Sequence, residues 1–189
     1  MTEALLIIDM QAEMQHRIDA GYDCVNPDAS GRIDALARAF RQSGRPVIHI
    51  RHREADPASP MRPGGAGYPP MPCAEAAPGE AVFDKTTSSA FASTDLAQHL
   101  AAAGITGLAV TGAVAGFCVN SSVRAGCDLG LAMRVVPDAV LGFGLHDLSA
   151  RVIFDVTMAH LAADFATLID SADLIAELTT EGTATPAGA

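Results

Sequence analysis

The sequence has few positively charged residues for its length. Of 189 residues, 12 are Lys or Arg and 22 are Asp or Glu, which gives a formal net charge of −10. Proteins that bind nucleic acids or anionic membranes use clusters of Lys and Arg to neutralise phosphates. The shortage of cations therefore excludes these two partners and leaves a small molecule as the expected ligand.

Membrane-spanning and export signals are also lacking. No apolar run reaches the roughly 20 residues needed to cross a bilayer, and the first residues lead into strand-like sequence rather than a signal peptide. The cysteines are not arranged as the CxxC pairs of redox or zinc motifs. We therefore expect a cytoplasmic protein with free thiols at Cys24, Cys73, Cys118 and Cys127.

Apolar strand-like runs alternate with amphipathic stretches along the chain. Strands are expected near residues 4–9, 46–51, 80–84, 107–112, 132–136 and 166–169. Helices are expected near residues 28–43, 92–103, 117–129, 147–161 and 171–178. This alternation, with 49% hydrophobic and 18% charged residues, predicts one α/β domain over residues 1–178. The small and polar residues 179–189 are expected to form a flexible tail.

Three of the apolar runs lead into side chains that can carry out chemistry. Asp9 ends the first run, Lys85 ends the third, and Cys118 follows the fourth at the start of an expected helix. The carboxyl ends of parallel strands meet at one edge of a sheet, where open α/β folds bind ligands. A helix start also favours an anion and lowers the pKa of a cysteine. Each residue has an ordinary alternative: a helix cap for Asp9, a solvated group for Lys85 and a buried core thiol for Cys118.

Several short motifs, widely spaced along the chain, carry a family resemblance. They are Ile-Ile-Asp-Met-Gln at 7–11, Lys85 followed by Ser-Ala-Phe and Thr94, Thr-Gly followed by Cys118-Val and Arg124, Asp-Leu-Gly at 128–130, and Val-Pro-Asp-Ala at 136–139. From about Ala4 to Ser171 the chain resembles the isochorismatase-like cysteine hydrolase superfamily, which includes nicotinamidases, carbamoylsarcosine amidases and ureidoacrylate amidohydrolases. The resemblance implies a three-layer α/β/α fold with a six-stranded parallel sheet in the order 3-2-1-4-5-6.

The resemblance also implies a covalent mechanism without a cofactor. Cys118 would attack a carbonyl carbon, Asp9 would take the thiol proton, and Lys85 would orient Asp9 and stabilise the charge. The backbone N–H groups of Val114 and Cys118 would hold the oxyanion, next to a cis peptide between Ala113 and Val114. The implied reaction is hydrolysis of a C–N bond in a small amide, carbamoyl or ureido compound through a thioester.

The metal-binding signature of some relatives is missing. Nicotinamidases carry Asp-x-His…His after the second strand, where this chain reads Val-Ile-His-Ile-Arg-His-Arg-Glu-Ala-Asp at 47–56. His49 and His52 lie three residues apart, so on a strand their side chains point to opposite faces. We therefore expect no metal, with His52 as a hydrogen-bonding pocket residue and His49 in the core.

The substrate pocket has several candidate walls. The Asn-Asp-Phe that usually follows the opening motif is replaced by Ala12-Glu-Met14, which removes an aromatic residue. The Pro- and Gly-rich residues 53–79 connect the second and third strands and are expected to form a wall over the crevice. The candidate pocket residues are Gln11, His52, Tyr68, Phe91 and Phe117, of which the three aromatic side chains could equally belong to the core.

Two other functions remain open. One is hydrolysis of a vinyl ether, as in isochorismatases. The isochorismatases of the superfamily lack this cysteine, so Cys118 counts against that reaction. The other is non-enzymatic binding of a small metabolite, and the complete set of Asp9, Lys85 and Cys118 counts against it.

The segment 149–163 is apolar over a wide helical arc. A helix packed on a sheet buries only one side within its own subunit, so the second apolar side needs another partner. We therefore predict a homo-oligomer, a dimer or a tetramer, with this helix or the 53–79 loop in the contact. The alternative is a monomer in which the second side packs against a neighbouring helix.

Overall fold

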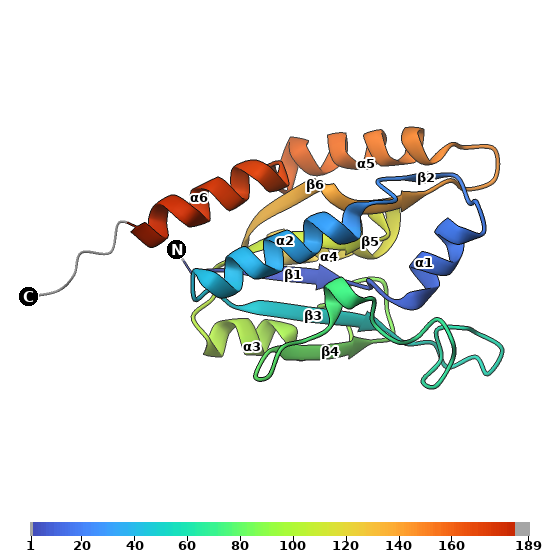
Figure 1. Cartoon of the computed structure of the whole chain (residues 1–189), viewed down its shortest axis with the longest axis horizontal. Helices are drawn as coiled ribbons and strands as arrows, with labels where there is room; N and C mark the ends of the chain where they lie inside the picture. Colours follow the sequence, from blue (N-terminus) through green and yellow to red (C-terminus); the bar gives the residue numbers. More distant parts are fainter. Residues whose placement is uncertain (1, 184–189) are drawn as a thin grey trace, which may run out of the picture.

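Strand β1 lies at the centre of a mostly parallel sheet, and the structure, a computed structural model, describes residues 2–183 (Figure 1). Six strands run parallel in the order β4-β3-β1-β5-β6-β7. Their bounds are β1 Glu3–Ile8, β3 Val47–His52, β4 Ala81–Lys85, β5 Gly107–Ala113, β6 Ala132–Phe143 and β7 Thr167–Leu168. When the six predicted strands are numbered along the chain, without β2, this order is 3-2-1-4-5-6. The predicted α/β fold and strand order are therefore confirmed.

The sheet has one strand more than predicted. The two-residue strand β2 (Cys24–Val25) pairs antiparallel with the end of β6, so the predicted six-stranded, wholly parallel sheet is wrong by this strand. β6 also continues well past its predicted end at residue 136. Pro137 has no N–H to donate, but the Asn26 side chain donates to the carbonyls of Pro137 and Val140 at 2.9 and 2.8 Å. This contact supports the strand on the far side of the proline.

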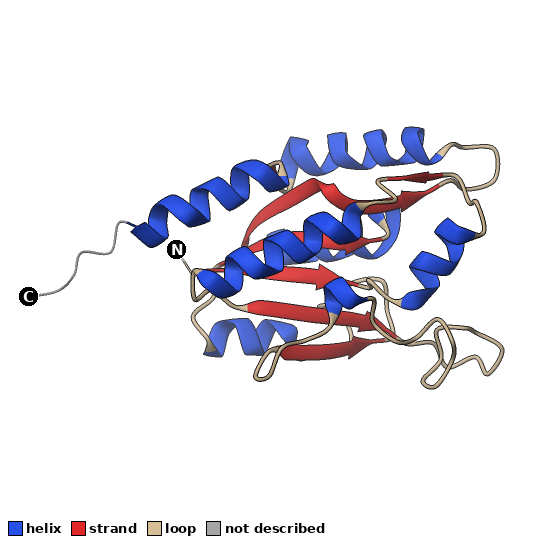
Figure 2. Ribbon diagram, viewed as in Figure 1, coloured by secondary structure: helices blue, strands red, loops and turns tan. Residues whose placement is uncertain are grey.

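Helices cover both faces of the sheet and give the predicted three-layer α/β/α arrangement (Figure 2). One face carries α2 (Ala29–Gln42) and α6 (Ser171–Thr183), and the other carries α3 (Leu96–Ala102), α4 (Asn120–Asp128) and α5 (Ala150–Asp164). All of β1 is buried. Leu5 and Ile7 lie in the core under α2 and α6, and Leu6 and Ile8 lie in the core under α3, α4 and α5. The alternation of side chains along a strand therefore fills both cores at once.

Two segments differ from the predicted helix bounds. Helix α1 (Ala12–Asp19) is missing from the prediction because Met14 is its one buried residue, so the sequence shows no apolar stripe there. Helix α6 continues through Thr183, past the predicted start of the tail at residue 179, since Leu174 and Leu178 pack in the core. The rest of the expected tail, residues 184–189, lies outside the described residues.

Candidate active site

Asp9, Lys85 and Cys118 converge at the carboxyl end of the sheet. Asp9 follows β1, Lys85 is the last residue of β4, and Cys118 lies in the π-helical turn η2 (Ala115–Val119) between β5 and α4. Lys85 Nζ lies 2.7 Å from Asp9 Oδ2 and 3.2 Å from Cys118 Sγ. Lys85 is fully buried and Asp9 is 3% exposed. The buried ammonium group therefore bridges the carboxylate and the thiol.

The backbone around Asp9 is unusually close to β5. Asp9 has a φ of +51°, in the left-handed region that non-glycine residues seldom occupy. Gly112, which pairs with Ile8, has a φ of +110°, and a Cβ there would lie 2.0 Å from the Ile8 carbonyl oxygen. Only glycine fits this contact. The peptide bond between Ala113 and Val114, the position at which the family resemblance implies a cis bond, is cis.

Burial shifts both titrating partners of Lys85 toward their protonated forms. Burial raises the pKa of Asp9, and the Lys85 ammonium offsets only part of this effect. Burial, and then the charge of Asp9, raise the pKa of Cys118 to about 12. The expectation that the helix start lowers this pKa is therefore wrong, because burial and the charge of Asp9 raise it. The resting site holds a thiol beside a carboxylate that accepts a proton more readily than an ordinary aspartate.

His52 is a third partner of the Lys85 ammonium group, besides Asp9 and Cys118. Its Nδ1 lies 3.0 Å from Lys85 Nζ and accepts a hydrogen bond, because an ammonium group can only donate. Burial, and then the charge of Lys85, lower the pKa of His52, so the ring is neutral. Nε2 therefore carries the ring proton and faces Glu54 Oε1 at 3.7 Å. His52 thus fixes the direction of one N–H bond of Lys85.

Gln11 ties three segments together behind the site. Its Nε2 donates to the carbonyls of His52 and Tyr68 at 3.0 and 2.8 Å, and its Oε1 accepts from the His52 N–H at 2.8 Å. The side chain is fully buried. The prediction that Gln11 lines the pocket is therefore wrong, because its amide is used to join the ends of β1 and β3 to the 53–79 loop.

A cavity of about 250 Å³ contains the side chains of Asp9 and Cys118. Two of the predicted pocket residues, His52 and Phe117, line it, and Phe117 is 47% exposed. Five further side chains that line it were not singled out from the sequence: Met14, Arg17, Ser88 and, within the 53–79 loop that was expected to form a wall, Glu54 and Met61. Met14 stands where relatives carry an aromatic residue, and this departure was the one available signal. The other four lie in α1 or in loops and follow no motif.

Tyr68 and Phe91, which were predicted as pocket walls, are not among the residues that line this cavity. The Tyr68 hydroxyl donates to Asp84 Oδ1 at 3.0 Å, on the outer strand β4. Phe91 packs against the core on the α3–α5 side of the sheet, near Gly126. Loops position both rings, and the direction of a loop side chain leaves no periodic pattern in a sequence.

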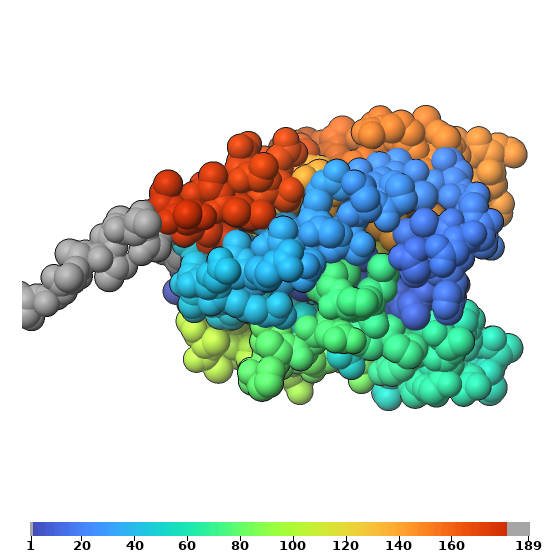
Figure 3. Space-filling model, viewed as in Figure 1, coloured from blue at the N-terminus to red at the C-terminus, as the bar shows by residue number. Residues whose placement is uncertain are grey.

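The 53–79 loop packs beside α1 at this end of the molecule (Figure 3). The N–H groups of Ala12 and Glu13 donate to the carbonyls of Pro69 and Gly67 at 2.8 and 3.0 Å. From the loop, Met61 is buried and reaches the cavity. The loop therefore contributes a wall of the pocket while it is held to α1 by main-chain hydrogen bonds.

Three side chains of metal-ligating type surround the same ammonium group. The Asp9 carboxylate, the His52 ring and the Cys118 sulfur lie within 4.8 Å of one another. Lys85 Nζ contacts each of them, at 2.7, 3.0 and 3.2 Å. A metal ion bound by these groups would have to displace a buried cation. His49 does not join them, because its Nε2 lies 2.8 Å from Glu80 Oε2.

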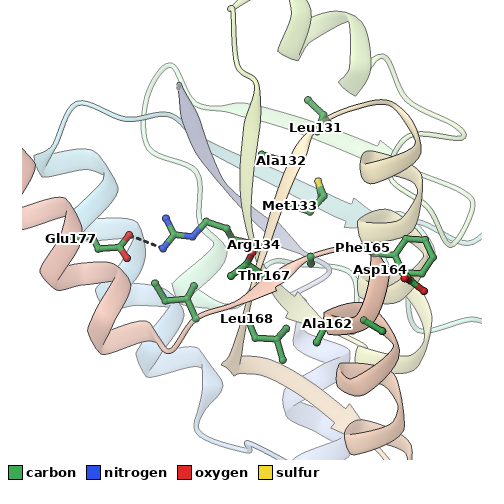
Figure 4. A pocket seen from close by; sticks show the side chains of 13 residues that line it. Leu131, Ala132, Met133, Arg134, Ala162, Asp164, Phe165, Thr167, Leu168 and Glu177 are labelled. Carbon is green, nitrogen blue, oxygen red and sulfur yellow. Dashed lines mark hydrogen bonds and ion pairs between the residues drawn. The ribbon is translucent and has the colours of Figure 1, made fainter.

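A larger cavity, of about 660 Å³, lies at the opposite end of the sheet (Figure 4). It is formed by the start of β6, by β7 and by the end of α5. Arg134 and Glu177, which line it, pair with each other at 2.6 Å. Its lining contains no Cys, His or Lys. This cavity therefore holds no thiol, imidazole or amine, whereas the smaller cavity contains the Cys118 thiol beside Asp9.

Known proteins are similar to this chain in sequence and in fold. The family model of the isochorismatase domain matches residues 3–173. A crystal structure from Chromobacterium violaceum, of a protein assigned to the isochorismatase family, has a TM-score of 0.89 and 34% identity, covering 95% of this chain and 94% of that one. A secreted isochorismatase effector of Verticillium dahliae is 30% identical over 173 residues, covering 90% of this chain and 88% of the effector.

Streptothricin hydrolase of Streptomyces noursei is 35% identical over 173 residues. The match covers 87% of this chain but 59% of that relative, so the chain spans little more than half its length. The family model, in contrast, covers nearly the whole chain from β1 into α6. On this evidence the protein belongs to the isochorismatase family of hydrolases.

Proposed function

We propose that the protein is a cysteine-dependent hydrolase that cleaves a C–N bond of a small amide, carbamoyl or ureido substrate. In the first step Asp9 removes the thiol proton of Cys118 while the sulfur attacks the carbonyl carbon. The oxyanion accepts hydrogen bonds from the backbone N–H groups of Val114 and Cys118. Asp9 then gives the proton to the leaving nitrogen, the C–N bond breaks, and a thioester remains on Cys118.

Water completes the cycle in the second step. Asp9 removes a proton from the water molecule as its oxygen adds to the thioester carbon. The C–S bond then breaks, the acid leaves, and the proton on Asp9 returns to the sulfur. Lys85, which contacts the sulfur, stabilises the sulfur anion as it leaves.

The position of Lys85 is the observation that carries this proposal. Its Nζ contacts both Asp9 Oδ2 and Cys118 Sγ, and these two residues line the cavity that would hold the substrate. The pKa of Cys118, about 12, means that the resting sulfur is a thiol, so attack requires a base at the same moment. The position of Asp9 and the rise in its pKa on burial support its assignment as that base.

The test is to trap the thioester. Wild-type protein is mixed with a panel of amides, carbamoyl amino acids and ureido acids, quenched within milliseconds, and digested for mass spectrometry while released ammonia is measured. We expect an acyl group on Cys118 with the substrates that release ammonia. Cys118→Ala should lose both signals, and Cys127→Ala, a matched control in α4, should keep both.

Other outcomes would favour the alternatives. Turnover of a vinyl ether by wild-type protein and Cys118→Ala alike would favour the isochorismatase reaction. Binding of panel compounds with neither ammonia nor an acyl adduct would favour a metabolite-binding protein. Ammonia release by Cys118→Ala at the wild-type rate would contradict the covalent mechanism.

We also propose that the protein forms a homo-oligomer, at least a dimer, through helix α5. Val152 and Val156 lie one turn apart on this helix and are 50% and 51% exposed, while Phe154 and Met158 pack in the core. Light scattering at micromolar concentration should give a multiple of the 19.4 kDa chain mass. A mass of one chain would contradict the proposal, and Val152→Lys should reduce the mass of the assembly.

The cytoplasmic location stays a prediction. Among residues 2–183, no helix combines the length and apolarity needed to cross a membrane. One of the relatives is named as a secreted effector, so membership of the family does not fix the compartment.

A further inference from the structure

The cations that lack an acidic partner are concentrated near the active site. Eight of the 12 Lys and Arg residues pair with a carboxylate. Within residues 2–183, the four without such a pair are Arg51, Arg53, Arg62 and Arg124. The guanidinium of Arg124 lies over the Phe165 ring at 4.0 Å. The other three lie at the end of β3 or in the loop that follows it.

Two of these arginines line one groove beside the catalytic cavity. The groove has a volume of about 440 Å³ and is lined by Arg53, Glu54, Arg62 and Thr86, among others. Glu54 also lines the catalytic cavity, so the two spaces share a wall. Thr86 directly follows Lys85 in the chain. The groove therefore lies next to the cavity that contains the reacting groups.

The backbone fixes the groove relative to Lys85. The Arg53 N–H donates to the Lys85 carbonyl at 2.9 Å, and the Glu54 N–H donates to the Met61 carbonyl at 3.2 Å. The second bond joins the residues that follow Arg53 and precede Arg62, and both arginines line the groove. Both arginine side chains are exposed. Arg62 Nη1 donates one hydrogen bond, to the Pro63 carbonyl at 3.4 Å, and the other N–H groups of the two guanidinium groups are available to a ligand.

The charge of the groove suits an anion with a single charge. Arg53 and Arg62 contribute two positive charges, and Glu54 contributes one negative charge. In the catalytic cavity itself, the Arg17 guanidinium is already paired with Glu13, at 3.0 Å. A carboxylate matches both the net charge of the groove and the bidentate geometry of arginine, whereas a phosphate dianion would exceed that charge.

We propose that this groove binds a carboxylate of the substrate, so that the enzyme acts on small amides that carry a carboxylate several bonds from the scissile C–N bond. The inference rests on the proposed hydrolase function. The protein has a net charge of −10, and Arg53 and Arg62, which pair with no carboxylate among the described residues, make this groove a site that attracts an anionic group.

The experiment measures anion capture without requiring turnover. Cys118 is alkylated with N-iodoacetyl derivatives of glycine, β-alanine and γ-aminobutyrate, and with their neutral methyl esters, and the rate is followed by peptide mass spectrometry. For at least one chain length we expect the acid to react about tenfold faster than its ester at low ionic strength. Added salt should reduce the ratio, because it screens exposed charges.

Variants locate the effect. Arg53→Gln with Arg62→Gln should bring the ratio of acid to ester close to one, while the rate with the ester stays as in wild type and shows that the site is intact. Arg38→Gln is the matched control, because Arg38 is an exposed arginine on α2 that pairs with Asp34. This variant should keep the wild-type ratio.

Each contrary result has one meaning. Two results would contradict the proposal that the groove binds an anion: equal rates for acid and ester in wild type, or a preference for the acid that survives in the double variant. An N-iodoacetyl aminoethylphosphonate that reacts faster than every carboxylate would overturn the assignment to a carboxylate. If wild type prefers the acids but hydrolyses no amide, the proposed hydrolase function would be contradicted, while the proposal that the groove binds a carboxylate would stand.

Discussion

Strand β4 has an ionic cluster at each end, and the two clusters differ in how completely their carboxylates are hydrogen-bonded. Before its first residue, Glu80 accepts from Arg41 at 2.7 and 2.9 Å, from His49 at 2.8 Å and from the Ala77 N–H at 2.8 Å. At its last residue, Lys85 pairs with Asp9 at 2.7 Å. The second oxygen of Asp9, Oδ1, has no hydrogen-bond partner among the described residues.

The pKa values of the two carboxyl groups follow from this difference. Burial alone would raise the pKa of Glu80, but hydrogen bonds from Arg41, the Ala77 N–H and His49 hold it at about 2. Burial raises the pKa of Asp9, and Lys85 does not compensate. A carboxylate whose oxygens are all occupied anchors the structure, whereas one with a free oxygen can still accept a proton. The same strand therefore carries a structural acid and a reactive one.

The sharpest way to test this distinction is to replace each carboxylate by its amide. Asp9→Asn should lower kcat/KM by about 10²–10⁴-fold, the usual contribution of a general base. Glu80→Gln, the matched control, should leave kcat/KM unchanged. Steady-state kinetics on any substrate from the hydrolase panel decides the matter. An active Asp9→Asn protein would mean that another group takes the thiol proton.

Removing the cation at the reactive end should cost stability. Lys85→Met leaves Asp9 as an unpaired buried carboxylate, and the free energy of unfolding at pH 7.5 should fall by about 3–5 kcal/mol. Without the ammonium the pKa of Asp9 rises further, so the loss is present at neutral pH and shrinks as Asp9 protonates in acid. Urea unfolding at pH 7.5 and pH 5 measures this difference. A loss that is the same at both pH values would show that the Asp9 charge is not its cause.

The effect of a substitution at the structural end should also shrink in acid, but over a lower pH range set by the pKa of Glu80. Glu80→Gln weakens hydrogen bonds to a charged group and should lower the free energy of unfolding at pH 7 by about 2 kcal/mol. Because the pKa of Glu80 is about 2 in the folded protein and 4.5 by itself, its contribution is present above pH 4.5 and is lost as the pH falls toward 2. The gap between wild type and variant should therefore close in acid. A gap that widens in acid would contradict this role.

The smallest expected effect concerns the reactivity of the thiol. The negative charge of Asp9 raises the pKa of Cys118, so Asp9→Asn should speed alkylation by iodoacetamide at pH 8 while it slows turnover. Peptide mass spectrometry gives the rate at Cys118, and Cys127 in the same protein serves as the internal reference. Slower alkylation would mean that Asp9 already holds the thiol proton in the resting enzyme.

The sequence predicts the strands and reactive groups because each is marked by composition. When an apolar run ends in Asp9 or Lys85, we expect the run to form a parallel strand and the charged side chain to lie at the carboxyl edge of the sheet. The helix α1 and the strand β2 carry no such mark, because α1 buries only Met14 and β2 is two residues long.

The environment of each group is less predictable than its position. The helix start after Cys118 is visible in the sequence, but the desolvation that raises its pKa depends on packing from β1, β4 and the 53–79 loop. Gln11 looks like a pocket residue by its place in the motif, yet its amide is taken up by main-chain groups 41 and 57 residues away. Contacts across such separations have no signature in one sequence.

The walls of the catalytic cavity come from segments other than the strands that carry its chemistry, and this division suits the protein to directed evolution. Met14, Met61, Ser88 and Phe117 lie in α1, in two different loops and in the turn η2. A saturation library at these four positions varies the shape of the cavity without touching Asp9 or the close β1–β5 contact at Gly112. Libraries that include Gly112 should instead yield almost no folded protein, because any side chain there meets the Ile8 carbonyl.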